Sequence, residues 1–217
     1  MTGEPKRTYD ATRRRQRAER ERQATHRRVV DAARTLFLGR GYVATTMADI
    51  AREAGVALQS VYKAAHSKAD LLHEVRDLAV AGDDRQVMLL DRPEYAAVRA
   101  EADPVRQVEM FASLIATAME RLAPVWAAYR EAAAVDAKAA ADLVATQQRR
   151  HHTFANLIGA IPEQRLRHPP AEAADTAWAI ASPEVYLLLQ SVLGWDDRRC
   201  AEWLTSTLAD VLLVPEP

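Results

Sequence analysis

The chain has 217 residues, of which 49% are apolar, 27% charged and 6% aromatic, and its formal net charge is −1. The apolar residues are numerous enough to form a core, which excludes a largely disordered chain. The single cysteine, Cys200, excludes a disulfide framework and a cysteine-ligated zinc site. No apolar run reaches the roughly 18 residues that a membrane span needs, and no apolar segment of a secretory signal follows the basic N-terminus. We therefore expect a soluble, cytoplasmic protein.

The charge is unevenly distributed along the chain. Residues 1–76 hold 16 Lys and Arg against 9 Asp and Glu, whereas residues 77–217 hold 13 against 21. A basic half beside an acidic half indicates two functional parts, the first of which faces a polyanion. The first 28 residues alone carry 10 basic and 4 acidic side chains. We expect residues 1–24 to be a basic, disordered arm that can follow a phosphate backbone.

The sequence after this arm has a helical pattern. The first helix has one apolar face, formed by Val29, Ala33, Leu36 and Phe37. Thr46 with Asp49 three residues later is a capping-box pattern and opens a second helix, which Gly55 ends. A short third helix follows through residues 59–63. Ser67 is the expected cap of a fourth helix, which joins the two parts of the chain.

The second half repeats the helical pattern after an irregular stretch. Residues 81–103 are predicted to be a loop that contains at most a helical turn. Further helices are predicted over residues 104–122, from residue 124, and over residues 135–161, 171–181, 183–193 and 196–213. No β pattern competes with them, so the sequence predicts an all-α fold.

Two short helices joined by a glycine turn behind a longer helix describe a helix-turn-helix. Ala54-Gly55-Val56 supplies the small residue and the buried aliphatic side chain that the tight turn requires. The pattern continues as Gly41-Tyr42-x-x-Thr45-Thr46-x-x-x-Ile50-Ala51-x-x-Ala54-Gly55-Val56, then Val61-Tyr62 and Ser67-Lys68-x-x-Leu71-Leu72. Over residues 25–72 this segment resembles the DNA-binding domain of the TetR family of transcriptional repressors.

The resemblance implies an N-terminal three-helix DNA-binding domain over residues 25–72 and a larger helical effector-binding and dimerisation domain over residues 73–217. It also implies a set of DNA contacts: Thr45, Thr46, Tyr62 and Lys68 toward phosphates, and Leu58, Gln59, Ser60 and Lys63 on the exposed face of the recognition helix. The family's usual His-Phe pair after the tyrosine is replaced here by Ala64-Ala65. This departure predicts a repacked junction with one fewer phosphate donor.

The second domain is implied to hold an apolar or amphipathic effector between its central helices and to dimerise through its last two helices. The predicted effector contacts are Phe111, Trp126, Tyr129, His152, Phe154 and Trp178. The predicted dimer contacts are Tyr186, Leu187, Leu189, Leu193, Trp203, Leu204, Leu208 and Leu212.

We expect a ligand-responsive transcriptional regulator, in the first place a repressor, that binds a palindromic DNA operator as a homodimer and is released by a small effector. The alternative is a TetR-like dimeric helical module that binds a small molecule or a protein partner without sequence-specific DNA binding. An enzyme is not expected, because the sequence has no glycine-rich phosphate loop and no nucleophile elbow. No metal or other cofactor is expected, because the adjacent His151 and His152 would point about 100° apart on a helix.

Overall fold

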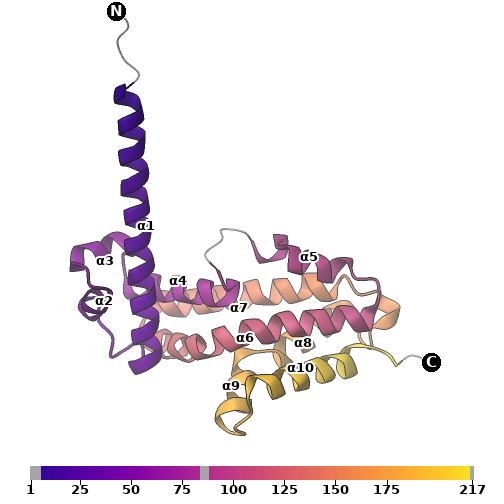
Figure 1. The fold of residues 1–217 in the computed structure, drawn as a ribbon. Coiled ribbons are helices and arrows are strands. Elements are labelled where there is room, and N and C mark those ends of the chain that lie inside the picture. The colour runs from indigo at the N-terminus through magenta and orange to yellow at the C-terminus, as the bar shows by residue number, and fades with distance from the viewer. Residues whose placement is uncertain (1–5, 84–87, 216–217) are drawn as a thin grey trace, which may run out of the picture. The chain divides into compact units, whose positions relative to one another are not determined.

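The computed structural model of the chain describes residues 6–83 and 88–215, with side chains from residue 13 onward. It divides into two compact units, Met1–Val75 and Arg76–Pro217, and Figure 1 shows the order of their elements. The described residues form α-helices and two short 3₁₀ helices, with one isolated β-bridge between Leu166 and Leu213 and no β-strand. The predicted all-α fold is confirmed. In the described part of the chain, no helix combines the length and the apolar character that crossing a bilayer requires.

The first unit contains α1 (Lys6–Arg40), α2 (Met47–Ala54), α3 (Leu58–Ala64) and the first half of α4 (Lys68–Ala81). The expectation of a disordered arm was wrong for residues 6–24, because α1 begins at Lys6 and extends well past α2 and α3 (Figure 1). This segment is rich in Arg, Glu, Gln and Ala, which favour helix, and Arg17 pairs with Glu21 one turn later at 2.8 Å. Residues 1–5 of the predicted arm lie outside the described residues.

The core of the first unit forms where α1 meets α2, α3 and α4. The predicted apolar face of α1 is buried, and the fully enclosed side chains opposite it are Ile50, Val61, Leu71 and Leu72. The rings of Phe37 and Tyr42 lie 5.6 Å apart at the end of α1. The two short helices are therefore held by a common core, which leaves their outer faces in solvent.

The second unit contains η1 (Leu89–Asp91), α5 (Pro93–Ala100), α6 (Pro104–Val135), α7 (Ala137–Ile158), η2 (Glu163–Arg165), α8 (Pro170–Ile180), α9 (Pro183–Ser191) and α10 (Asp197–Leu212). In Figure 1, α6 and α7 run side by side, and α10 packs along α6. Pro93 occupies the first turn of α5, a position that suits proline. A helix therefore replaces part of the loop that the sequence predicted.

The sequence also predicted a helix break at Pro124, and this was wrong. Pro124 lies inside a continuous α6. A proline within a helix removes one hydrogen bond and clashes with the preceding turn. Its neighbours Ala123, Val125 and Trp126 are all buried, at 1% exposure or less. Burial on both sides of the proline offsets this local cost and keeps the helix continuous.

Candidate nucleic-acid interface and ligand sites

The N-terminus of α2 is fixed by a complete capping box. The backbone N–H of Asp49 donates to the Thr46 hydroxyl at 3.1 Å, and the backbone N–H of Thr46 donates to the Asp49 carboxylate at 3.1 Å. The Thr46 hydroxyl also donates to the same carboxylate at 2.7 Å. These hydrogen bonds, with smaller contributions from Arg52 and Arg40, lower the pKa of Asp49 to about 2. The predicted cap is confirmed, and Thr46 itself is exposed.

The turn between α2 and α3 depends on a left-handed glycine. Gly55 has φ 64° and ψ 39°, and its N–H donates back to the carbonyls of the last turn of α2. Val56 N–H donates to Ala51 O at 3.0 Å, which closes the end of α2. This geometry directs the chain into α3, whose Val61 is completely buried. The opposite face of α3 is presented to solvent and consists of Leu58, Gln59, Tyr62 and Lys63, with Ser60 partly exposed.

The structure changes the role of Thr45. Its side chain is completely buried, and its hydroxyl donates to Gly41 O at 2.8 Å and lies 3.4 Å from Leu36 O. The expectation that Thr45 contacts a phosphate was therefore wrong for the side chain. This threonine instead fastens the loop between α1 and α2 to the end of α1.

Lys68 also has partners inside the unit. Its ammonium donates to Tyr42 O at 2.7 Å and to Thr45 O at 2.8 Å, and it lies 4.0 Å from the centre of the Tyr42 ring. Two carbonyls and an aromatic face are favourable surroundings for a half-buried cation. Lys68 thus joins the start of α4 to the loop before α2, a role that the sequence motif did not indicate.

The alanine pair that replaces His-Phe lies at the end of α3. Ala65 is buried, and its N–H donates to Val61 O at 2.9 Å. A methyl group thus occupies the inward-facing position, and α3 still closes normally.

The aromatic residues predicted to contact an effector fill the core of the second unit. Phe111 and Phe154 meet edge to face at 5.0 Å, and Trp126 and Tyr129 lie 6.3 Å apart. These four side chains are at most 1% exposed, and Trp178 is partly exposed. His152 is exposed, so the structure does not bring it to the others as predicted.

Arg150 and Trp126 have partners in this core, whereas the side-chain amide of the buried Gln107, Arg150 Nε and Trp178 Nε1 have no hydrogen-bond partner in the part of the chain that the structure describes. Arg150 lies 5.0 Å from the ring centres of both Phe154 and Trp178, and burial lowers its pKa to about 10. Trp126 Nε1 donates to Glu184 at 2.8 Å. Among the described residues, no group of three His, Cys, Asp or Glu side chains could hold a metal ion.

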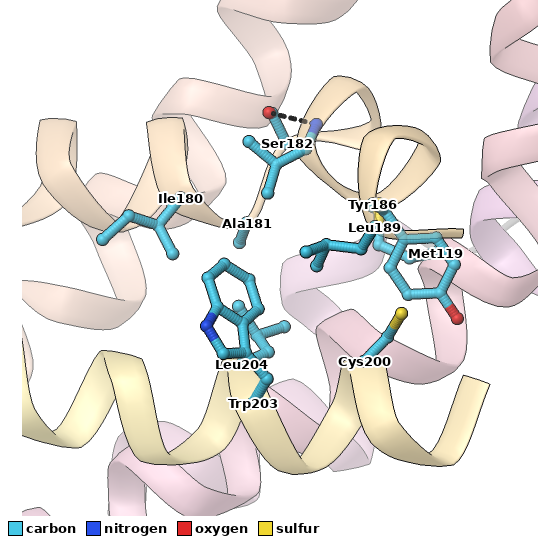
Figure 2. A pocket seen from close by; sticks show the side chains of 10 residues that line it. Met119, Ile180, Ala181, Ser182, Tyr186, Leu189, Cys200, Trp203 and Leu204 are labelled. Carbon is cyan, nitrogen blue, oxygen red and sulfur yellow. Dashed lines mark hydrogen bonds between the residues drawn. The ribbon is translucent and has the colours of Figure 1, made fainter. Parts of the chain in front are cut away.

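Two cavities lie outside this aromatic core. Figure 2 shows the smaller one, an apolar hollow of about 10 Å³ toward which Ile180, Leu189 and Trp203 converge from α8, α9 and α10. That volume corresponds to roughly one water molecule. The larger cavity, of about 260 Å³, lies among the end of α4, η1, α5 and α6. Its polar wall includes Arg92 and Arg121, which sequence reasoning missed because one lies in a predicted loop and neither belongs to a motif.

The predicted dimer contacts divide into two groups. Tyr186, Leu204, Leu208 and Leu212 are buried within the protomer, where α9 and α10 pack on α6, so the expectation that they form an intermolecular surface was wrong. Leu187, Leu189 and Trp203 are partly exposed, and Leu193 is 58% exposed. Sequence reasoning missed Leu188 and Val192, which are 57% and 70% exposed. These two residues lie one turn apart and could have been found from the i, i+4 spacing alone.

Comparisons with known proteins agree with this geometry. The family model described as bacterial regulatory proteins of the tetR family matches residues 29–75. No curated protein sequence matches the chain. Among solved structures, NalD, the secondary repressor of the MexAB-OprM multidrug efflux pump in Pseudomonas aeruginosa, is 21% identical with a TM-score of 0.64, and the match covers 89% of this chain and 98% of that one.

Two further structures contain small molecules. The SmeT–triclosan complex is 16% identical with a TM-score of 0.64, covering 89% of this chain and 98% of that one. A transcriptional regulator from Saccharomonospora viridis in complex with choline is 18% identical with a TM-score of 0.66, covering 88% and 98%. At these identities the structures show a shared fold, and the matched helix-turn-helix shows the DNA-binding domain. Residues 29–75, which hold the helix-turn-helix, are thus similar to the DNA-binding domain of the tetR family of bacterial regulatory proteins.

Proposed function

We propose that the protein is a ligand-responsive transcriptional repressor that binds a palindromic operator as a homodimer and leaves it when a small effector binds. The exposed face of α3 carries this proposal. Val61 anchors the helix from behind, and Gln59, Tyr62 and Lys63 stand outward on a helix fixed by the Gly55 turn. A helix held in this way can enter the major groove, where side chains read base edges.

Each exposed side chain of α3 has a chemistry suited to DNA. Gln59 can pair with adenine through two hydrogen bonds, and Lys63 can reach guanine or a phosphate. Tyr62 can donate a hydroxyl hydrogen bond to a phosphate, while Leu58 and Ser60 complete the surface. Thr46 would reach a phosphate only if its hydroxyl gave up the hydrogen bond that it donates to Asp49. We assign Lys68 to positioning the loop before α2, because its ammonium already binds two carbonyls.

The basic part of α1 supports a contact with the DNA backbone. Arg14, Arg15 and Arg20 are exposed, and none of them has an acidic partner among the described residues. Arginines that neutralise phosphates raise the affinity for DNA of any sequence, and this part of the affinity decreases as the salt concentration rises. We place the arm contact on the helical segment that begins at Lys6.

A dimer is needed to read a palindrome. Leu188, Val192 and Leu193 expose apolar surface at the end of α9, and a second copy related by a twofold axis would cover it. Such a dimer would present two α3 helices to half-sites about 34–36 Å apart.

The effector step has support from the structural neighbours. Proteins of this fold have been solved with triclosan and with choline, and NalD is a repressor. A ligand can release DNA only to the extent that it prefers the released conformation. We propose the same logic for this chain.

Selection of bound duplexes from a random DNA pool tests the proposal. We expect a palindromic sequence, and titration with the selected duplex should show that Lys63→Ala weakens binding by about 5- to 150-fold and relaxes one base position. Tyr62→Phe should weaken binding to all sequences alike. Lys138→Ala, an exposed lysine of the second unit, is the matched control and should change nothing. A folded dimer that enriches no sequence would contradict the proposal and favour the DNA-independent module.

A further inference from the structure

The larger cavity of the second unit has two distinct walls. It measures about 260 Å³ and lies where the last turn of α4 meets η1, α5 and α6. Leu89, Tyr95 and Leu114 contribute apolar surface, and the charged lining residues are the cations Arg92 and Arg121 and the acids Asp83 and Glu94. An apolar body beside a few polar groups is typical of sites for small organic ligands.

Both arginines bind the C-terminus of α4. Arg121 donates from Nε to Ala79 O at 2.9 Å and from Nη2 to Val80 O at 3.4 Å. Arg92 donates from Nη1 to Ala81 O at 3.1 Å. The last carbonyls of a helix lack partners within it and carry the negative end of its dipole, so these cations stabilise the end of α4.

The close approach of Arg121 to the end of α4 depends on Gly82, the residue that follows this helix. Gly82 has φ 76°, and a Cβ added there would lie 3.1 Å from the Arg121 guanidinium carbon. A side chain at this position would press on the guanidinium. The glycine thus allows the arginine to reach the helix end.

The two arginines differ in their charge balance. Arg92 forms a two-point ion pair with Asp83, at 3.0 and 3.2 Å. Among the described residues, Arg121 has no carboxylate partner, and its hydrogen bonds go to neutral carbonyls. A guanidinium has five N–H donors in a planar fork, so the edge formed by Nη1 and the second N–H of Nη2 remains for another acceptor. A carboxylate matches that edge with two parallel hydrogen bonds.

Tyr95 adds a neutral donor to the same cavity. Burial raises the pKa of its phenol, and nearby Glu94 raises it further. The hydroxyl therefore stays protonated at neutral pH and can donate a hydrogen bond to an anion.

We propose that this cavity binds a small organic carboxylate, with its anionic group on the second edge of Arg121 and its apolar body against Leu89, Tyr95 and Leu114. The role of the cavity rests on the proposed function: in a ligand-responsive repressor, this cavity is the effector site. A carboxylate paired with the guanidinium balances its charge, which reduces its electrostatic attraction to the carbonyls of Ala79 and Val80 and weakens the hold on the end of α4. Because α4 continues into the DNA-binding unit, the ligand favours release of the operator.

Calorimetric titration of the full chain tests the binding site directly. The probes are benzoate, 2-naphthoate and octanoate, each paired with its neutral carboxamide. We expect at least one acid to bind with a Kd below about 1 mM and its amide to bind at least about tenfold more weakly. If none of the acids binds, or an acid and its amide bind equally, the proposal is wrong.

Three variants separate the cavity from general electrostatics. Arg121→Ala should abolish binding of the acid. Ser113→Phe, at an exposed position of α6 that lines the cavity, should block it while leaving Arg121 in place. Arg130→Ala removes an exposed arginine of the same helix, away from the cavity, and should bind the acid like the unaltered chain. Retained binding in folded Arg121→Ala and Ser113→Phe proteins would overturn the site.

The regulatory step is measured separately, with the selected operator. The acid should weaken operator binding by the unaltered chain. It should not change operator binding by the Ser113→Phe variant. If calorimetry shows the acid in the cavity and operator affinity does not change, the carboxylate site stands and its role as effector site is wrong. If an acid binds but no operator is ever enriched, the proposed function fails while the site remains.

Discussion

The buried cation Arg76 makes a sharp test of what holds α4 to the second unit. Arg76 is almost fully enclosed, with its side chain 3% exposed, and its Nη2 lies 2.7 Å from Asp77 and 3.7 Å from Asp142. Its Nη1 donates to the Thr146 hydroxyl, and the Tyr129 hydroxyl donates to Asp142. Burial lowers the pKa of Arg76, which shows that its environment disfavours the charge.

Asp142→Asn removes one charge and keeps an oxygen that can accept from the Tyr129 hydroxyl. Taking one partner from a buried ion pair costs about 3–5 kcal/mol, because the remaining charge stays buried without compensation. Asp77 is nearer to Arg76 and remains, although it is 57% exposed. We therefore expect the lower end of that range, about 3 kcal/mol.

Arg76→Met should cost less, about 1 kcal/mol, because a flexible apolar side chain replaces the buried cation and its hydrogen bond. The double variant should then be less destabilised than the sum of the two, with a coupling energy of about 2 kcal/mol. Asp175→Asn removes an exposed acid that pairs with His151 and should cost less than about 0.5 kcal/mol.

Urea unfolding followed by tryptophan fluorescence measures these energies. All four tryptophans lie in the second unit, so the signal reports this unit alone. Protein concentration is kept constant across variants, because association with a second copy would shift the midpoint. If Asp142→Asn costs less than about 1 kcal/mol, or if the two substitutions are additive, the ion pair does not hold α4 as we argue.

Three further predictions concern the first unit and the dimer. Gly55→Ala should destabilise α2 and α3 by about 1 kcal/mol, because Gly55 has a left-handed φ of 64°. Gly39→Ala, inside α1, is the control and should not destabilise them. Hydrogen exchange of the α2 amides measures the difference between the two variants. The pKa of Asp49 is about 2 in the folded chain and 3.8 for an ordinary aspartate, so its contribution to stability is present above pH 3.8 and is lost as the pH falls toward 2. Asp49→Asn should therefore flatten the acid unfolding curve, followed by circular dichroism, between pH 3.8 and 2. An unchanged curve would refute the role of the hydrogen bonds between Asp49 and Thr46. Leu188→Glu should convert the proposed dimer to a folded monomer in light scattering, and a persisting dimer would place the interface elsewhere.

Local sequence signals predicted the DNA-binding unit well, because its elements are set by short-range chemistry. The capping box of Thr46 and Asp49, the glycine turn and the apolar face of α1 each depend on residues a few positions apart. Thr45 and Thr46 are identical in the motif, however, and only the fold places one in the core and the other in solvent.

The errors in the second unit have a common physical cause. A leucine face on a helix looks the same in sequence whether it packs on its own protomer or on another copy, so Leu204 and Leu208 were misassigned to a dimer surface. At Pro124, burial of both neighbours overrode a local helix-breaking signal. Arg121 gave no signal, because its importance depends on Ala79, which is 42 residues away in sequence.

The contacts along α4 explain how a signal could pass through it. At its start, Lys68 is bound to two carbonyls of the first unit, and in its second half Arg76 is bound to side chains of α7. Its last carbonyls are bound by Arg121 and Arg92. In the proposed mechanism, a ligand that weakens the contacts at the end of α4 acts on the DNA-binding unit through this continuous helix. These four cations thus hold α4, and the two that line the larger cavity, Arg92 and Arg121, are the ones that the proposed ligand would meet.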